Sequence, residues 1–129
     1  MLKNEEKESA KNILVIDDDI MTLKSIEKQL KSQNYNLCMV SNPTLAVKML
    51  FENDFDLILT DIKMSPIDGI DVLKKIKSYR PGVPVIILTG EPDEAIKNSA
   101  KELGCSDFLT KPVAKKQLID AINNVKKIY

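Results

Sequence analysis

Two hydrophobic periodicities alternate along the chain. Short runs rich in Ile, Val, Leu or Phe, with turn residues close by, predict β-strands, and the amphipathic stretches between them have the spacing of α-helices. The five strand candidates are Ile13–Ile16, Leu37–Val40, Leu57–Thr60, Val85–Leu88 and Asp107–Leu109. The longest of these runs are apolar throughout, which is typical of strands that are covered on both faces.

Helix boundary signals lie between the strand candidates. Asn42 stands before Pro43, which favours an N-cap residue followed by proline at the first helical position. Pro92-Asp93-Glu94 places negative charge in the first turn of a later helix, and Gly104 is expected to end that helix.

Two further helices are predicted in the second half of the chain. The third helix is expected to begin at Asp68-Gly69 and to close at Tyr79-Arg80-Pro81-Gly82. The last helix is predicted from about Lys115 to Ile128, with one apolar stripe facing the core. That stripe consists of Leu118, Ile119, Ile122 and Val125.

Strict alternation of strands and helices predicts a parallel sheet with helices on both faces. Ten elements in 129 residues indicate an α/β, doubly wound, five-stranded parallel sheet of order 2-1-3-4-5 with five helices. We expect a polar N-terminal arm over residues 1–10 and one domain over residues 11–129. In sheets of this kind, ligands bind at the carboxyl ends of the strands.

Composition and charge narrow the function classes. Hydrophobic residues make up 43% of the chain, and 19 basic side chains balance 19 acidic ones. A formal charge of zero gives no electrostatic reason to expect nucleic acid or an anionic membrane as a partner. The polar start of the chain lacks the apolar core of a signal peptide, and Val83–Leu88 is far too short to span a bilayer. We therefore expect a cytoplasmic protein.

The histidine and cysteine content argues against histidine-based catalysis and against a zinc site. The absence of histidine removes the usual general base and the usual zinc ligand. Cys38 and Cys105 are expected to be small buried hydrophobic residues in a reducing compartment, because two isolated cysteines form no recognisable ligand set.

Reactive side chains follow four of the five predicted strands. Asp17, Asp18 and Asp19 follow the first strand, Asp61 follows the third, Thr89 follows the fourth, and the fifth leads to Lys111. Because the carboxyl ends of parallel strands meet at one edge, these side chains are expected to converge. Clustered carboxylates raise one another's pKa, and Mg²⁺ relieves that repulsion. A carboxylate can also form an acyl phosphate, a reaction that needs mainly positioning and charge neutralisation.

Each residue also has a simpler interpretation. Asp19, directly before Ile20, is favoured as a helix N-cap rather than a metal ligand. Thr89 alone would be a turn residue, and Lys111 alone would be a solvated charge. Only their joint placement points to phosphoryl chemistry.

Four stretches resemble the receiver domain of two-component response regulators. They are ILVIDDD (13–19), DLILTDIKMSPIDG (56–69), PVIILTG (84–90) and DFLTKPV (107–113). Together and in this order they are highly specific, and the resemblance extends from about Lys11 to Ile128. It implies a chemotaxis-regulator-like, flavodoxin-like fold and a phosphorylation-activated signalling switch.

The resemblance implies a role for each matching residue around the acceptor. Asp61 would accept the phosphoryl group. Asp18 and Asp61, together with the backbone carbonyl of Lys63, would coordinate Mg²⁺, and Asp17 would assist, through water. Lys111 would pair with the phosphoryl oxygens.

The resemblance also implies a set of switch residues. Thr89 would hydrogen-bond the phosphoryl group and shift inward, and Phe108 matches the aromatic residue whose rotamer follows that threonine. Pro112 matches a proline whose preceding peptide bond is cis. The surface of the fourth helix, fifth strand and fifth helix would then change its preferred partner, as a population shift between two packings.

The acceptor loop departs from the family pattern at one position. The family usually places proline directly after the loop methionine, whereas Ser65 stands there in this chain and Pro66 follows. Lys63 and Glu91 lie two residues after the acceptor and two after the threonine. We expect them to pair across the pocket mouth and slow hydrolysis of the phosphate; the alternative is that both are merely exposed charges.

The implied partners are a sensor histidine kinase or phosphotransfer protein and a downstream effector, with a homodimer through the same surface as a further option. Four lysines of the last helix fit either a solubilising face, which is favoured, or a docking surface; they are Lys115, Lys116, Lys126 and Lys127. No direct contact with nucleic acid or membrane is expected, and no enzymatic activity beyond the chain's own phosphorylation and slow autodephosphorylation.

Two other function classes stay open. A small haloacid-dehalogenase-like phosphohydrolase would use Asp17 as its nucleophile, because Asp17 and Asp19 have D-x-D spacing, although Met21 stands where that class has threonine. The other class is a receiver-like interaction module that takes no phosphate. The intact acid set, together with Thr89 and Lys111, argues against it.

Overall fold

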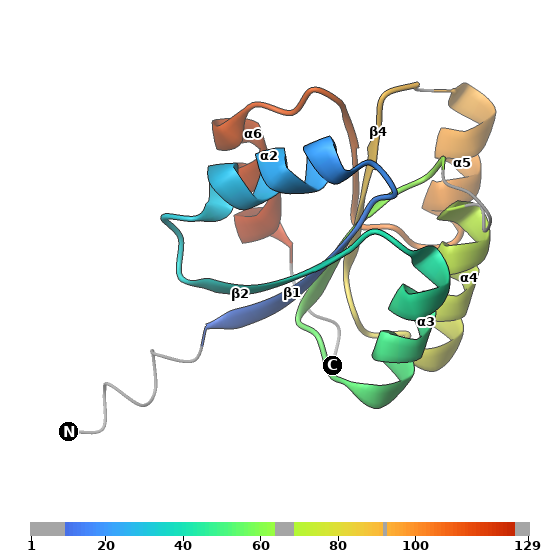
Figure 1. Cartoon of the computed structure of the whole chain (residues 1–129). Coiled ribbons are helices and arrows are strands. Elements are labelled where there is room, and N and C mark those ends of the chain that lie inside the picture. The colour runs from blue at the N-terminus through green and yellow to red at the C-terminus, as the bar shows by residue number, and fades with distance from the viewer. Residues whose placement is uncertain (1–9, 64–68, 92, 126–129) are drawn as a thin grey trace.

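The computed structural model describes residues 10–63, 69–91 and 93–125. Within them, five parallel strands form one sheet of order β2-β1-β3-β4-β5, and five helices cover it (Figure 1). The predicted doubly wound α/β fold with strand order 2-1-3-4-5 is therefore confirmed. None of the helices in this part of the chain has the length and hydrophobicity needed to cross a lipid bilayer.

Every strand contains its predicted apolar run and continues one or two residues beyond it. The strands are β1 (Lys11–Ile16), β2 (Tyr35–Val40), β3 (Leu57–Asp61), β4 (Val85–Thr89) and β5 (Asp107–Thr110). Most of the added residues are polar. Because backbone ladder bonds do not depend on side-chain polarity, an apolar run marks only the buried part of a strand.

The helices begin at or next to their predicted first residues. They are α2 (Ile20–Leu30), α3 (Pro43–Glu52), α4 (Gly69–Tyr79), α5 (Glu94–Glu102) and α6 (Lys115–Asn124). The side chains of Asp19, Asn42 and Asp93 accept hydrogen bonds from backbone N–H groups of the first helical turn. Gly104, just beyond the end of α5, has a φ of +90°, a conformation that glycine adopts without strain.

The predicted end of the last helix is wrong. α6 stops at Asn124, and Val125 has an extended backbone with φ −77° and ψ 136°. Two consecutive asparagines, which are weak helix formers, account for the early stop. Leu118 and Ile122 are buried as predicted, whereas Ile119 and Val125 are only partly buried.

The cysteines are less buried than expected. Cys38 and Cys105 are free thiols of intermediate exposure at the margin of the core. Cys38 lies on the edge strand β2, and Cys105 lies in the turn before β5, so neither is covered on both sides. Partial burial raises the pKa of both thiols.

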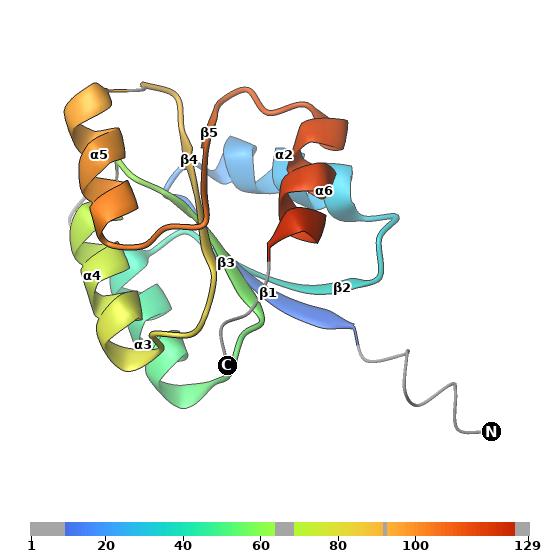
Figure 2. The same ribbon diagram turned by 180° about the vertical axis from the view of Figure 1, so that it is seen from behind.

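Two core layers hold the sheet between the helices. α2 and α6 cover one face, and α3, α4 and α5 cover the other (Figures 1 and 2). Successive strand residues point to opposite faces, so Ile13 and Val15 pack beneath α2 and α6, while Leu14 and Ile16 pack beneath the other three helices. This packing fixes the strands in register and brings the polar residues at their carboxyl ends to one edge.

Candidate functional site

One lysine joins two buried carboxylates at the carboxyl edge of the sheet. Lys111 Nζ lies 2.6 Å from Asp17 Oδ2 and 2.9 Å from Asp61 Oδ2. Asp17 is 1% exposed and Asp61 is 7% exposed. The three residues come from the ends of β1, β3 and β5, as the strand-end argument predicts.

The backbone around Asp17 holds its carboxylate in place. The Asp17 N–H donates to the carbonyl of Val40, which ties the end of β1 to β2. The Asp19 N–H donates to Asp17 Oδ1 at 2.9 Å, while Oδ2 faces Lys111. Both oxygens of Asp17 are therefore engaged by fixed donors.

Asp61 is the last residue of the central strand β3. The Lys63 N–H donates to its Oδ1 at 3.1 Å, and the buried Thr60 hydroxyl donates to its backbone carbonyl at 3.0 Å. The backbone of Gly69 also comes so close that a Cβ there would lie 2.3 Å from Ile62 Cα and 2.6 Å from the Asp61 carbonyl oxygen. The end of β3 is thus held by contacts on both sides of Asp61.

Burial and the neighbouring charges shift the pKa values of this cluster in opposite directions. Burial raises the pKa of Asp17, and the hydrogen bond from Lys111 opposes that rise. Burial by itself lowers the pKa of Lys111, but the two neighbouring carboxylates outweigh it, so that pKa lies above its ordinary value. The lysine therefore stays charged at neutral pH and offsets part of the acidic charge.

Three carboxylates offer a cation site at the same edge. Ligand oxygens of Asp17, Asp18 and Asp61 all lie within 4.8 Å of one another. Oxygens on opposite sides of one Mg²⁺ are about 4.2 Å apart, so the cluster is close to the size that this ion requires. The donor set, made only of hard oxygens, fits Mg²⁺ or another hard divalent cation.

Lys63 and Glu91 pair at the mouth of the site. Lys63 Nζ and Glu91 Oε1 are 2.9 Å apart, and both side chains are largely exposed. The hydrogen bond between them raises the pKa of Lys63 and lowers that of Glu91. Together with Asp61, Thr89 and Lys111 they line an open cavity of about 340 Å³. The predicted pairing across the mouth is therefore present.

Thr89 is buried beside this cavity at the end of β4. Its hydroxyl accepts a hydrogen bond from the Glu91 N–H at 3.2 Å, and its carbonyl accepts one from the Lys111 N–H at 2.7 Å. The Lys111–Pro112 peptide bond is cis, as the resemblance implies. The backbones of β4 and β5 are therefore joined directly behind the reactive side chains.

Phe108 lies away from the acid cluster. It is partly buried against the core layer beneath α3, α4 and α5, and the Lys97 ammonium of α5 stands 5.9 Å from its ring centre. The structure thus places Phe108 on the surface that α5 and β5 share. Ser65 and Pro66 lie outside the described residues.

Three supporting residues were not anticipated from the sequence. Thr60 braces the end of β3, and Gly69 permits the close approach of α4 to that strand. Thr22 of α2 lines the open cavity that also contains Asp61, Thr89 and Lys111, which we call the acid cavity. A hydroxyl residue within an otherwise apolar strand is the signal that could have pointed to Thr60. No local signal distinguishes Thr22 from an ordinary exposed helix residue.

Comparison with known proteins gives a consistent result. A model of the response regulator receiver domain family matches residues 13–123. The transcriptional regulatory protein ZraR of Klebsiella oxytoca is 36% identical over 102 residues, which cover 79% of this chain and 23% of ZraR. GlrR of Escherichia coli is 33% identical over 113 residues, which cover 88% of this chain and 26% of GlrR. The chain spans about a quarter of the length of these two relatives.

Solved structures agree with the family match. A response regulator receiver domain from Clostridium thermocellum is 36% identical with a TM-score of 0.83, and the match covers 88% of this chain and 92% of that one. A CheY-like receiver domain from Methanospirillum hungatei is 28% identical with a TM-score of 0.86, and the match covers 89% and 92% of the two chains.

Proposed function

The chain belongs to the response regulator receiver domain family, the phosphorylation-activated switches of two-component signalling, and we propose that Asp61 is its phosphoacceptor. One observation carries this assignment. Asp61 ends the central strand with its carboxylate 2.9 Å from a partly buried ammonium and within a three-carboxylate cluster. Nucleophile, counter-charge and cation ligands are thus held together before any phosphodonor binds.

The transfer is an in-line displacement at phosphorus. The Asp61 carboxylate attacks, an acyl phosphate bond forms, and the bond from phosphorus to the donor's leaving group breaks. Lys111 exchanges its contact with the Asp61 carboxylate for the new phosphoryl oxygens. Asp17, Asp18, Asp61 and the backbone carbonyl of Lys63 would hold Mg²⁺, which when bound neutralises charge on the phosphoryl oxygens.

Thr89 and Phe108 would convert phosphorylation into a change of surface. The phosphoryl group offers strong acceptors to the Thr89 hydroxyl, which now accepts a hydrogen bond from the Glu91 N–H. Movement of Thr89 would free space for the Phe108 ring, which would leave Lys97. The surface built from α5, β5 and α6 would then favour a different partner, or a second copy of the chain.

The pair formed by Lys63 and Glu91 would control how long the phosphate persists. Both side chains line the cavity that contains Asp61, and their ion pair spans its mouth. An intact pair restricts the approach of water to the phosphoryl group from the solvent side. We therefore assign the two residues to the rate of autodephosphorylation rather than to phosphoryl transfer.

Asp17 is a poor alternative nucleophile. It is 1% exposed, and among the described residues Asp61 lines the open cavity beside Lys63 and Glu91 whereas Asp17 does not. This arrangement counts against the haloacid-dehalogenase-like chemistry that would use Asp17. A purely structural interaction module has no use for three clustered carboxylates beside a partly buried lysine, since the cluster costs stability without a ligand.

A protein phosphodonor, such as a sensor histidine kinase or a phosphotransfer protein, is the proposed partner. Three exposed apolar side chains lie at the starts of α2 and α3, the helices that follow β1 and β2, namely Ile20, Met21 and Leu45, which are 46–70% exposed. Such side chains are typical of a docking surface.

The names of ZraR and GlrR make transcriptional control a candidate output, through other parts of a longer protein, without direct nucleic acid contact by this domain. The proposed setting is the cytoplasm.

Incubation with acetyl phosphate and Mg²⁺ tests the assignment of Asp61. We expect the wild-type chain to gain one phosphoryl group, seen by intact mass, and to gain none when Mg²⁺ is chelated. Asp61→Asn keeps the size of the side chain and removes the nucleophile, so it should stay unmodified. Phosphorylation of Asp61→Asn at the wild-type rate would contradict the proposal.

A further inference from the structure

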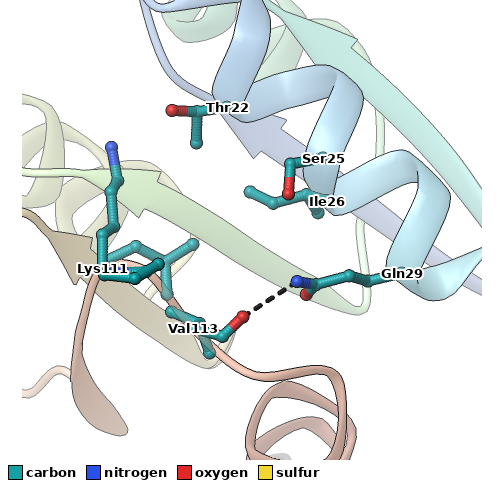
Figure 3. A pocket seen from close by; sticks show the side chains of 8 residues that line it. Thr22, Ser25, Ile26, Gln29, Lys111 and Val113 are labelled. Atoms are coloured by element: carbon teal, nitrogen blue, oxygen red, sulfur yellow. Dashed lines mark hydrogen bonds between the residues drawn. The ribbon is translucent and has the colours of Figure 1, made fainter.

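A second cavity lies on the other side of Lys111. It has a volume of about 340 Å³, is open to solvent on one side, and is bordered by α2, the end of β4 and the segment that joins β5 to α6 (Figure 3). Its apolar wall is formed mainly by Ile26, Leu88, Pro112 and Val113. The polar groups that face it come mostly from α2.

Gln29 leaves one hydrogen-bond acceptor unused beside this cavity. Its Nε2 donates to the backbone carbonyl of Val113 at 2.8 Å (Figure 3). Because a carbonyl can only accept, this bond fixes which end of the amide is nitrogen. Gln29 Oε1 is then buried with no donor among the described residues. A buried acceptor without a partner costs free energy that a suitable donor recovers.

We propose that this cavity binds a small, mostly apolar molecule whose single hydrogen-bond donor is accepted by Gln29 Oε1. The volume lies at the lower end of the range of small-molecule sites, and a few polar groups in an apolar wall are typical of such sites. The ligand class is therefore a neutral, mostly apolar compound with one N–H or O–H group.

The charges around the cavity do not favour an anionic ligand. Among the described residues that line it, Lys111 alone is basic, and the ammonium of Lys111 is engaged by Asp17 and Asp61. In Figure 3 the Lys111 side chain runs away from Gln29. Only the aliphatic stem of the lysine is thus available to a molecule in this cavity, which distinguishes the site from the acid cavity.

The position of the site gives it a means of regulation. Thr22 and Lys111 line both cavities, so a bound molecule would touch the stem of the lysine that contacts Asp61. This consequence rests on the proposed role of Asp61, whereas binding itself does not. Binding and phosphorylation are therefore tested separately.

Titration with indole and benzofuran, followed by ¹H–¹⁵N NMR of the whole chain, tests the ligand class. The two probes have nearly the same shape, but only indole has an N–H donor. We expect indole to bind about tenfold more tightly, the worth of one hydrogen bond to a buried acceptor. Shifts should centre on the Gln29 side-chain amide and the Val113 backbone amide. Equal affinity of the two probes, or shifts centred elsewhere, would overturn the proposal.

Two variants distinguish the contribution of the Gln29 hydrogen-bond acceptor from that of the cavity volume. Gln29→Leu should abolish the preference for indole by removing the acceptor. Ser25→Phe, at an exposed position that lines the cavity, should fill it and remove binding of both probes. Glu27→Phe is the matched control, because Glu27 is also exposed on α2 but lines a groove over β2 instead. Unchanged indole binding in Ser25→Phe would show that indole does not bind in this cavity and would contradict the proposal.

A side chain of the phosphodonor protein is the rival occupant. In that case neither probe binds, and Ser25→Phe slows phosphoryl transfer from the cognate protein while leaving transfer from acetyl phosphate unchanged. That combination would overturn the small-molecule proposal. Selective indole binding would stand even if Asp61 proved not to be the phosphoacceptor.

Discussion

Two ion-pair systems of similar length lie at the same edge of the sheet and differ in burial. Lys111 approaches Asp17 and Asp61 at 2.6 Å and 2.9 Å, with 19% of its side chain exposed. Lys63 approaches Glu91 at 2.9 Å, with 47% and 75% of the two side chains exposed. Distance alone would rank them as equals.

Burial decides what each pair contributes. Loss of one partner from the buried system leaves a charge that water cannot solvate, so stability and chemistry both depend on it. The exposed pair is solvated whether or not it forms and adds little to stability. It can nevertheless restrict access to the cavity. The comparison predicts one group of residues that changes stability together with phosphorylation and another that changes only the lifetime of the phosphate.

Removal of the Lys111 ammonium should have the largest effect. In Lys111→Met, two almost buried carboxylates lose their shared cation. We expect the free energy of unfolding without Mg²⁺ to fall by about 2–4 kcal/mol, below the range for fully buried pairs because Lys111 is partly exposed. Phosphorylation by acetyl phosphate should slow by about 100-fold, as for the loss of one positioned charge donor. Urea unfolding and intact mass measure the two.

Lys116→Met is the matched control for this variant. Lys116 pairs with Asp120 at 2.8 Å on the exposed face of α6, so its loss should change neither quantity measurably. Added Mg²⁺ should restore part of the stability of Lys111→Met, because it supplies positive charge to the same carboxylates. Equal stability of the two variants would break the distinction between buried and exposed pairs.

The backbone that carries Asp61 should be the next most sensitive feature. The Cβ of Gly69→Ala would lie 2.3 Å from Ile62 Cα, so the end of β3 or the start of α4 must move. We expect a loss of about 1–3 kcal/mol, typical of overpacking, and slower phosphorylation of Asp61. Gly90→Ala is the control for stability, since its Cβ would meet nothing within 4 Å. Thermal unfolding of the two variants at one pH decides; equal destabilisation would contradict the close-approach argument.

The exposed pair should give the smallest and most selective effect. Lys63→Ala and Glu91→Ala should each leave the urea midpoint unchanged and speed the decay of phosphorylated Asp61 severalfold. The double variant should decay at about the same rate as either single one, because both remove one shared contact. Unchanged decay in both single variants would return Lys63 and Glu91 to the status of ordinary exposed charges.

Most of the fold was predictable because it depends on local signals. Apolar runs located every strand, and Asp19 and Asn42 cap their helices as expected. Asp93 also caps its helix, although it was expected within the first turn. The errors in the predicted element bounds occur where the pattern of polar and apolar side chains does not follow the backbone hydrogen bonding. Polar strand ends were missed since hydrogen bonding continues beyond the buried run, and the end of α6 was placed too late because an apolar periodicity continues past Asn124.

Some contacts of the candidate site were also predictable from the sequence, and others were not. The convergence of Asp17, Asp61 and Lys111 follows from strand order alone, and the contact between Lys63 and Glu91 was expected from their positions relative to the acceptor. The bracing by Thr60 and the close approach at Gly69 depend on three-dimensional packing that no local pattern encodes.

Mapping the phosphorylated residue tests the central claim most directly. The wild-type chain is phosphorylated with acetyl phosphate and Mg²⁺, the acyl phosphate is reduced with borohydride to fix its position, and peptides are sequenced by mass spectrometry. We predict that the modified residue is Asp61, with Asp17 and Asp18 unmodified. Modification of Asp17 in place of Asp61 would contradict the account.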